Sequence, residues 1–308
     1  LEINIQKTSN DTYLKVHDVN TILAKKEIDV LQNSLDYFYN DDDLSLGFNV
    51  LASEDLSKTG RNRYEYFFPS ITLEKNIFNN DQLGTINWTS NILVRNYDVS
   101  NQTEFFVNDF NWESSVQDSN FGFENQLMAL FKTVNYSADT DTGTSFKQNG
   151  DQNEISGVLG YSSSLPLIKN KNDRLFNLDP KFFIRYAPGQ MRDISNSEGY
   201  WLTYDKIFNL NRSETLDIID PGLSTALGFN YSMNKIDGNN LNEIFTIDLG
   251  QVYNFDKNTD MPSKTSLNKK NSDLVGKATY YFNDKSKLNF DFNLDENYNN
   301  LNFASIGT

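Results

Sequence analysis

The 308-residue sequence predicts an all-β protein of the transmembrane antiparallel β-barrel class. Large apolar side chains alternate with small or polar ones along most of the chain, which is the period of a strand with one apolar and one polar face. The chain is hydrophilic, with a mean hydropathy of −0.59, yet 14% of its residues are aromatic. No run approaches the ~18 apolar residues of a membrane helix. A barrel strand needs only every second residue to be apolar, so these observations agree with one another.

About fourteen segments show this alternation, and their lengths suit the ~9–11 residues that a tilted membrane strand requires. Soluble sandwiches more often use strands of about five or six residues. The expected strands are 1–7, 27–40, 44–51, 64–77, 85–97, 103–114, 121–138, 153–167, 176–186, 222–234, 245–255, 274–282, 287–294 and 299–306.

In the strand expected at 176–186, the residue types indicate what surrounds its polar face. Asn177, Asp179, Lys181 and Arg185 alternate there with large apolar residues. Such side chains are costly against a packed core and favourable against a water-filled lumen. These four residues are therefore the lumen-facing candidates. The three charged ones either contact a partner or a phosphate group, or pair with one another across strands.

The connections between the expected strands alternate in length. Short polar turns occur at 40–43 and 283–286, and long ones at 9–26, 139–152, 187–221 and 256–272. Short turns on one rim and long loops on the other are typical of outer-membrane barrels. No linker or charge block divides the sequence, so we expect residues 1–308 to form a single barrel segment.

The connection at 187–221 is too long for a hairpin turn and far more apolar than a solvated loop. We expect it to fold over or into the barrel mouth, the alternative being a loop that packs on its neighbours without a role in transport. Its candidate functional residues are Arg192, Trp201, Tyr204, Phe208 and Arg212.

Composition excludes several classes of function. The chain has 27 Lys and Arg against 42 Asp and Glu, a net charge of −15, which argues against nucleic acid as a partner. With no Cys and one His, it lacks the residues of disulfides, zinc clusters and thiol nucleophiles. His17 is expected to be exposed, and 139–143 is expected to be a polar turn rather than a calcium loop, because the terminal Glu is missing. We expect no enzymatic activity, cofactor or metal.

Two further features have alternative explanations. The acidic surplus suits a solvated lumen and solvated loops, or carboxylates at the rim that engage divalent cations bridging lipid phosphates. Trp88, Trp112 and Trp201 suit the aromatic girdles of a membrane interface, although strand packing alone would explain Trp88. The chain starts at Leu1 without Met and stops within an expected strand, so we expect it to be part of a longer protein.

Several segments resemble one family, in the same order along the chain: 9–14, 68–70, 178–181, 185–192, 202–212, 260–262, 266–268 and 272–276. The clearest is 202–212, which contains Phe208, ends in Asn211 and Arg212, and is followed by the glycine-led strand at Gly222. These segments resemble the LPS-assembly outer-membrane protein family, LptD, also called organic solvent tolerance protein.

The resemblance implies a non-enzymatic translocon in the outer membrane of a Gram-negative bacterium. Its substrate would be lipopolysaccharide, received from periplasmic bridge proteins and passed to the outer leaflet, and a plug lipoprotein of the LptE type would occupy the lumen. The chain lacks the periplasmic domain that meets the bridge and has too few strands for the whole barrel. It therefore corresponds to a partial barrel, about 14 strands from the middle of a larger one, without the exit seam. The alternatives are a porin or receptor-type barrel for small solutes, and a secreted β-rich adhesin or glycan-binding module.

Overall fold

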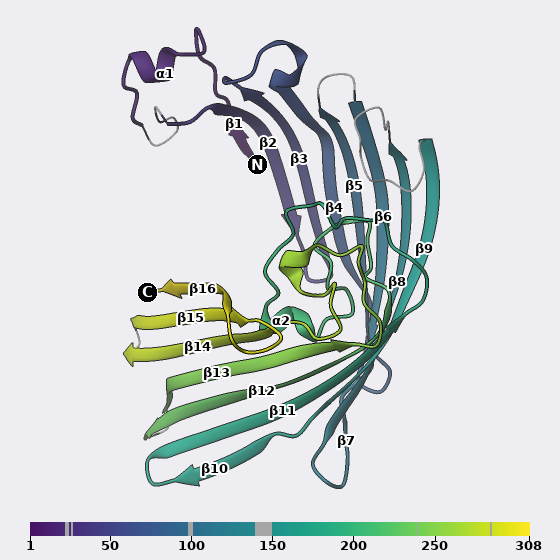
Figure 1. Ribbon diagram of the computed structural model, residues 1–308, viewed down its shortest axis with the longest axis vertical. Helices are drawn as coiled ribbons and strands as arrows, with labels where there is room; N and C mark the ends of the chain where they lie inside the picture. The colour runs from purple at the N-terminus through teal and green to yellow at the C-terminus, as the bar shows by residue number, and fades with distance from the viewer. Residues whose placement is uncertain (22–24, 26, 98–100, 139–149, 239, 284) are drawn as a thin grey trace. The chain divides into compact units, whose positions relative to one another are not determined.

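The fold is all-β and antiparallel, as predicted. The computed structural model describes residues 1–308 except 22–24, 26, 98–100, 139–149, 239 and 284 (Figure 1). Within that part of the chain the sheet has sixteen strands, and its main path is β1-β2-β3-β4-β5-β6-β8-β9-β11-β12-β13-β14-β15-β16. The short strands β7 and β10 lie off this path and pair with β8 and β11. Fourteen strands on the path agree with the fourteen expected, and a sheet of this order suits a partial barrel.

The strands are β1 (Glu2–Asn4), β2 (Val30–Asn40), β3 (Leu44–Asp55), β4 (Tyr64–Asn80), β5 (Gly84–Tyr97), β6 (Asn101–Glu113), β7 (Gln117–Asp118), β8 (Glu124–Ala138), β9 (Gly150–Ser164), β10 (Leu167–Lys171), β11 (Arg174–Ala187), β12 (Gly222–Asp237), β13 (Asn240–Asn254), β14 (Leu274–Asn283), β15 (Ser286–Leu294) and β16 (Leu301–Gly307). The helices are α1 (Tyr13–Val16) and α2 (Tyr204–Ile207), and single 3₁₀ turns occur at Gly60–Arg63 and Ser263–Thr265. None of the described helices has the length and apolar character needed to cross a membrane.

The register of β11 and β12 confirms the two-faced interpretation of these strands. Phe182 lies opposite Leu227 on one face, whereas Arg185 lies opposite Ser224 on the other. On the apolar face, Leu227 keeps 49% of its surface exposed. Burial in this region is therefore concentrated on the polar face, which is the opposite of what a sandwich of two sheets would give.

One expected strand is divided in the structure. The segment 153–167 forms β9, which ends at Ser164, and β10 begins at Leu167. Pro166 lies in the gap, and Pro180 lies in β11 between the residues that pair with Ser164 and Leu167. Proline has no N–H to donate to a ladder, so the break places both prolines where no bond is required.

The bounds of some strands also differ from expectation. The first strand spans only Glu2–Asn4 instead of 1–7, and β7 at Gln117–Asp118 was not expected. Most other strands start or end within four residues of the expected bounds, because the alternation fades gradually into the turns.

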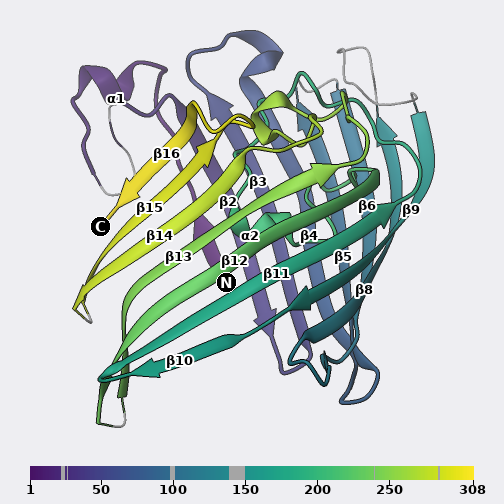
Figure 2. The same cartoon turned by 60° about the horizontal axis from the view of Figure 1, so that its bottom comes forward.

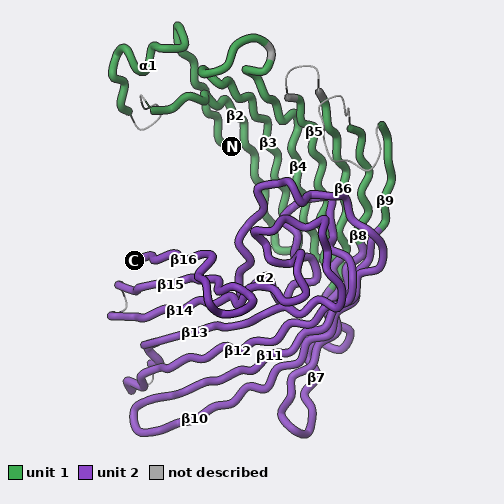
Figure 3. Tube along the Cα trace, in the orientation of Figure 1, with its two compact units in different colours: residues 1–78, 86–110, 132–155 green, residues 79–85, 111–131, 156–308 purple. Residues whose placement is uncertain are grey.

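The chain forms two compact units, each made of segments that pack mainly among themselves (Figure 3). Unit 1 comprises residues 1–78, 86–110 and 132–155, and its buried cluster joins Leu14 of α1 to Leu31 and Leu56. Unit 2 comprises residues 79–85, 111–131 and 156–308. Within unit 2, β11 to β16 run side by side (Figure 2), and the connection between β11 and β12 carries α2. Unit 2 contains the larger core, and the candidate site is built on it.

Candidate functional site

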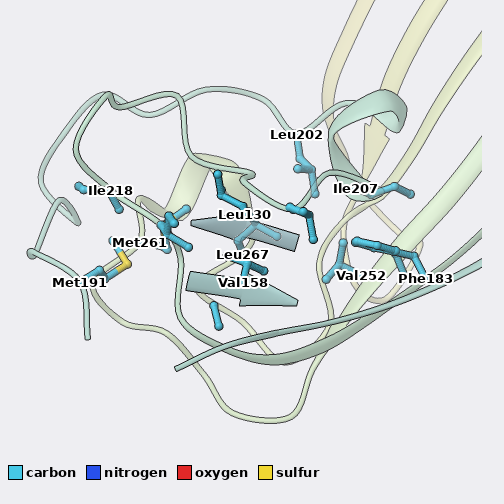
Figure 4. Close-up of a cluster of buried hydrophobic side chains, with 14 of the residues drawn as sticks. Leu130, Val158, Phe183, Met191, Leu202, Ile207, Ile218, Val252, Met261 and Leu267 are labelled. Carbon is cyan, nitrogen blue, oxygen red and sulfur yellow. The ribbon is translucent and has the colours of Figure 1, made fainter. Parts of the chain in front are cut away.

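The segment 188–221, which connects β11 to β12, packs on one face of the unit 2 sheet. Leu202 and Ile207 of this segment have no exposed surface, and they meet Phe183 and Val252 from the strands (Figure 4). The buried cluster consists of Leu130, Val158, Phe183, Ala187, Met191, Ile194, Leu202, Tyr204, Ile207, Leu210, Ile218, Ile219, Ala226, Val252, Met261, Leu267 and Val275. The apolar residues noted in the sequence of this connection therefore form its contact with the sheet.

Three glycines on this face, which we call the glycine floor, leave the space that the segment fills. They are Gly160 in β9, Gly228 in β12 and Gly250 in β13. A Cβ atom at Gly250 would lie 2.3 Å from Ile207 Cδ1, and one at Gly160 would lie 2.6 Å from Leu210 Cδ2. Carbon atoms normally approach to about 3.5–4.0 Å. The close approach of the segment thus requires that these strand positions have no side chain.

A buried cluster of charged residues holds the second half of the segment to β11. The Arg185 guanidinium on β11 donates to Leu210 O at 3.0 Å, to Asp220 Oδ2 at 3.1 Å and to Asp220 O at 2.9 Å. Arg212 Nε donates to the same carboxylate oxygen at 3.0 Å. All three side chains are at least 97% buried. One carboxylate between two guanidiniums compensates part of the positive charge, which would otherwise be costly to bury.

Polar contacts also hold the middle of the segment to the strands. Asn293 Nδ2 on β15 donates to Leu202 O at 2.9 Å. The Tyr204 hydroxyl donates to Asn230 Oδ1 on β12 at 3.1 Å. The Trp201 ring lies 5.4 Å from the Phe303 ring of β16. The segment is therefore attached to strands that lie far from it in the sequence.

The five mouth-loop candidates take different positions within unit 2. Tyr204 and Arg212 are buried in the contacts described above. Phe208 packs against the buried cluster, and its ring lies 5.2 Å from the Tyr204 ring. Arg192 donates two hydrogen bonds to Asp217, at 2.9 and 3.0 Å, within the segment. Trp201 is half-buried against β16, with the Lys264 ammonium 5.5 Å from its ring centroid.

The four lumen-facing candidates share one face of β11 but not one environment. Asn177 and Asp179 line a groove, and Lys181 Nζ lies 3.5 Å from Asp179 Oδ2. Arg185 has a different position from the one expected, because the segment 188–221 covers it and takes up its hydrogen bonds. Its guanidinium has 1% of its surface exposed and does not face open solvent.

The groove that receives Asn177 and Asp179 lies on this face of β11 to β15, and we call it the polar groove. Its volume is about 480 Å³. It is lined by Asn177, Asp179, Asn230, Tyr231, Ser232, Thr246, Asp248, Lys277, Thr279, Tyr281, Lys287, Asn289 and Asp291. Sequence reasoning named only its β11 residues. The signal for the others was present in the polar positions that alternate with apolar ones along β13 and β15.

The remaining candidates from the sequence do not join this site. His17 is exposed, and its ring lies 4.5 Å from the Tyr13 ring. The expected polar turn at 139–143 lies outside the described residues. Trp88 donates to Asn108 Oδ1, and Trp112 donates to Leu83 O. In the part of the chain that the structure describes, no three His, Cys, Asp or Glu side chains are grouped to hold a metal ion.

Comparison with known proteins gives a match over the whole chain. The model of the family LptD, described as LPS transport system D, matches residues 1–308. A search of curated proteins finds no match.

Proposed function

Because the chain belongs to the LptD family, LPS transport system D, we propose that its sheet forms part of the barrel wall along which lipopolysaccharide reaches the outer leaflet. The family is an outer-membrane family of Gram-negative bacteria and acts in transport rather than catalysis. The chain is accordingly a component of outer-membrane lipopolysaccharide transport. The family match over residues 1–308 is the observation that carries this conclusion, and it disfavours both the porin or receptor and the secreted adhesin.

The proposed mechanism is physical and uses the two faces of the sheet. Lipopolysaccharide joins a saccharide to acyl chains, and full desolvation of the saccharide would cost several kcal/mol for each unpaired polar group. A polar face keeps the saccharide hydrated while the acyl chains stay in apolar surroundings. The register of β11 with β12, which separates Asp179 from Phe182, supports this division of roles.

We assign two kinds of protein partner to the full-length protein. A plug lipoprotein of the LptE type would contact the polar face, where Asn177, Asp179 and Lys181 remain accessible. Periplasmic bridge proteins would act through a domain outside these residues. The segment 188–221 would close the polar face above Gly228 and Gly250, and the polar groove beside it stays open to other molecules.

Depletion of the full-length protein tests the function directly. We expect surface lipopolysaccharide to fall as the protein is depleted and to return when the wild-type gene is supplied in trans. Lipopolysaccharide on intact cells is measured with an impermeant label, and an abundant outer-membrane porin serves as the control for general envelope damage. Unchanged surface lipopolysaccharide would contradict the proposal. Uptake of small solutes that falls while lipopolysaccharide stays constant would favour the porin.

A further inference from the structure

Three cations lie side by side at one end of β10, β11 and β12, which are adjacent strands of unit 2 (Figure 2). Lys171 is the register partner of Arg174, and Arg174 is the register partner of Lys235. All three residues are exposed, and we call them the basic row. Like charges that face each other across strands destabilise a sheet, and the whole chain has a net charge of −15. A concentration of cations at one place therefore calls for an anionic partner.

The sheet itself supplies no such partner. None of the three cations forms an ion pair with another described residue. Arg174 Nη1 instead lies 3.7 Å from Met233 Sδ, which is a weak acceptor. Lysine is often used to protect the free edge of a strand, and this would explain Lys171 on β10. It would not explain Arg174 and Lys235, because β11 and β12 are paired on both sides at these positions.

The basic row lies on the apolar face of β11 and β12, beside the short turn at 172–173. Phe176 and Leu178 follow Arg174 on this face, and Tyr186 lies at its other end, opposite Leu223. Arg174 and Tyr186 are twelve positions apart in β11. At ~3.4 Å per residue and a tilt of ~45°, they would be separated by about 29 Å across a bilayer. This distance matches the ~30 Å hydrocarbon core of a membrane, so the row would lie at the level of the headgroups.

From this placement we infer that the basic row binds the headgroups of anionic phospholipids, an inference that rests on the proposed position of the sheet in the barrel wall. Short turns of outer-membrane barrels face the periplasm, so the lipids are those of the inner leaflet. Guanidinium and ammonium groups both donate to phosphate oxygens. Each Lys or Arg near an anionic membrane surface strengthens binding about fivefold. The other end of the same face presents Tyr186 and Leu223 instead, so the selection is confined to one leaflet.

Two other occupants fit the row less well. Lipopolysaccharide is delivered to the outer leaflet, which lies at the rim of the long loops and a full bilayer core away from the row. An acidic protein would reach only the charges, because Phe176 and Leu178 beside them face acyl chains. Interfaces between proteins usually anchor through aromatic or aliphatic side chains that the partner buries. A phospholipid matches both parts of the surface, since its phosphate meets the cations and its acyl chains meet the apolar residues.

Two positions at opposite ends of the apolar face of β11 provide a matched test. Benzoylphenylalanine, a photo-crosslinking residue, replaces either Phe176 beside the row or Tyr186, which is 51% exposed at the other end. The full-length protein is reconstituted into vesicles of equal parts phosphatidylglycerol and phosphatidylcholine, and the lipid adducts are identified by mass spectrometry. Both leaflets then have the same composition, so a difference between the positions reports selection by the protein. We expect the ratio of phosphatidylglycerol to phosphatidylcholine adducts at 176 to exceed that at 186 by about fivefold or more.

Charge variants identify the groups that select the lipid. With the crosslinker at 176, Arg174→Gln combined with Lys235→Gln should lower the adduct ratio by about fivefold or more. The matched control, Lys257→Gln combined with Lys270→Gln, removes two exposed cations from the loop at the opposite rim and should leave the ratio unchanged. In the protein without charge variants, raising NaCl from about 0.05 to about 0.5 M should lower the ratio at 176 alone, because salt screens exposed charges.

The outcomes separate this inference from the proposed function. Equal ratios at 176 and 186, or an unchanged ratio in the double variant, would overturn the inference alone. Adducts with polypeptide instead of lipid at 176 would also overturn it and would assign the basic row to an acidic protein. Lipid adducts from neither position would overturn the position of the sheet in the barrel wall together with the inference. The depletion experiment tests lipopolysaccharide transport independently of all these results.

Discussion

The glycine floor predicts that one methyl group on β13 should release the segment 188–221. In Gly250→Ala the new Cβ atom would lie 2.3 Å from Ile207 Cδ1, more than 1 Å inside ordinary contact. Ile207 is fully buried in the cluster, so its Cδ1 can move away only by displacing neighbouring side chains. Overpacking of this kind costs about 1–3 kcal/mol. The new Cβ atom would also lie 3.1 Å from Leu227 O of β12, but this contact is present whether the segment is docked or released. The clash with Ile207 exists only in the docked state, so its cost should raise the released population ~5- to 140-fold.

Trypsin reports the release, because cleavage after Lys206 or Arg212 requires the segment to leave the sheet. We expect cleavage of the full-length Gly250→Ala protein in detergent to accelerate by this factor. Gly157→Ala is the matched control, since its Cβ would meet only Leu130 O, at an ordinary 3.7 Å. Adding Ile207→Val removes the clashing Cδ1 and should restore much of the protection in a double-mutant cycle. Equal cleavage rates for Gly250→Ala and wild type would refute the argument.

Three further predictions concern the charged groups. Asp220→Ala leaves the guanidiniums of Arg185 and Arg212 uncompensated and should lower stability by about 3–5 kcal/mol, measured by urea unfolding in detergent. Asp217→Ala breaks the more exposed pair with Arg192 and should cost less. Equal losses of stability in the two variants would contradict the role given to burial. Arg185→Lys should accelerate tryptic cleavage of the segment 188–221, because an ammonium cannot reproduce the guanidinium fork that binds Leu210 O and Asp220 together. An unchanged cleavage rate would show that a positive charge alone suffices to hold the segment. Burial raises the pKa of the Asp273 carboxyl above its unfolded value, so the folded state holds the carboxyl proton more tightly than the unfolded state does. The contribution of this group to the free energy of unfolding therefore falls as pH rises from about 4 through the raised pKa. Asp273→Asn should remove that component of the pH dependence of thermal unfolding, and identical pH profiles would disprove it.

The strands were predictable because their signal is local. Alternation at 222–234 predicted β12, and the register with β11 confirmed which residues share a face. Pro166 was equally visible, and its missing N–H would have marked the break between β9 and β10. The site was less predictable, because what covers a residue depends on segments distant in sequence. Arg185 and Asp179 occupy equivalent positions in the alternating pattern of β11, yet Arg185 is buried and Asp179 lines the polar groove. Local sequence likewise gives no sign that Phe208 lies above Gly228 and Ile207 above Gly250.

The attachments of the segment 188–221 also bear on the order of folding. Most strands on the main path pair with the next one along the chain, so hairpins can form from contacts of short sequence separation. The bond from Asn293 to Leu202 spans 91 residues, and the stacking of Trp201 on Phe303 spans more. These contacts cannot exist before β15 and β16 have been synthesised and paired. The segment is therefore expected to reach its final position late, which leaves the polar face of β11 and β12 uncovered while the sheet assembles.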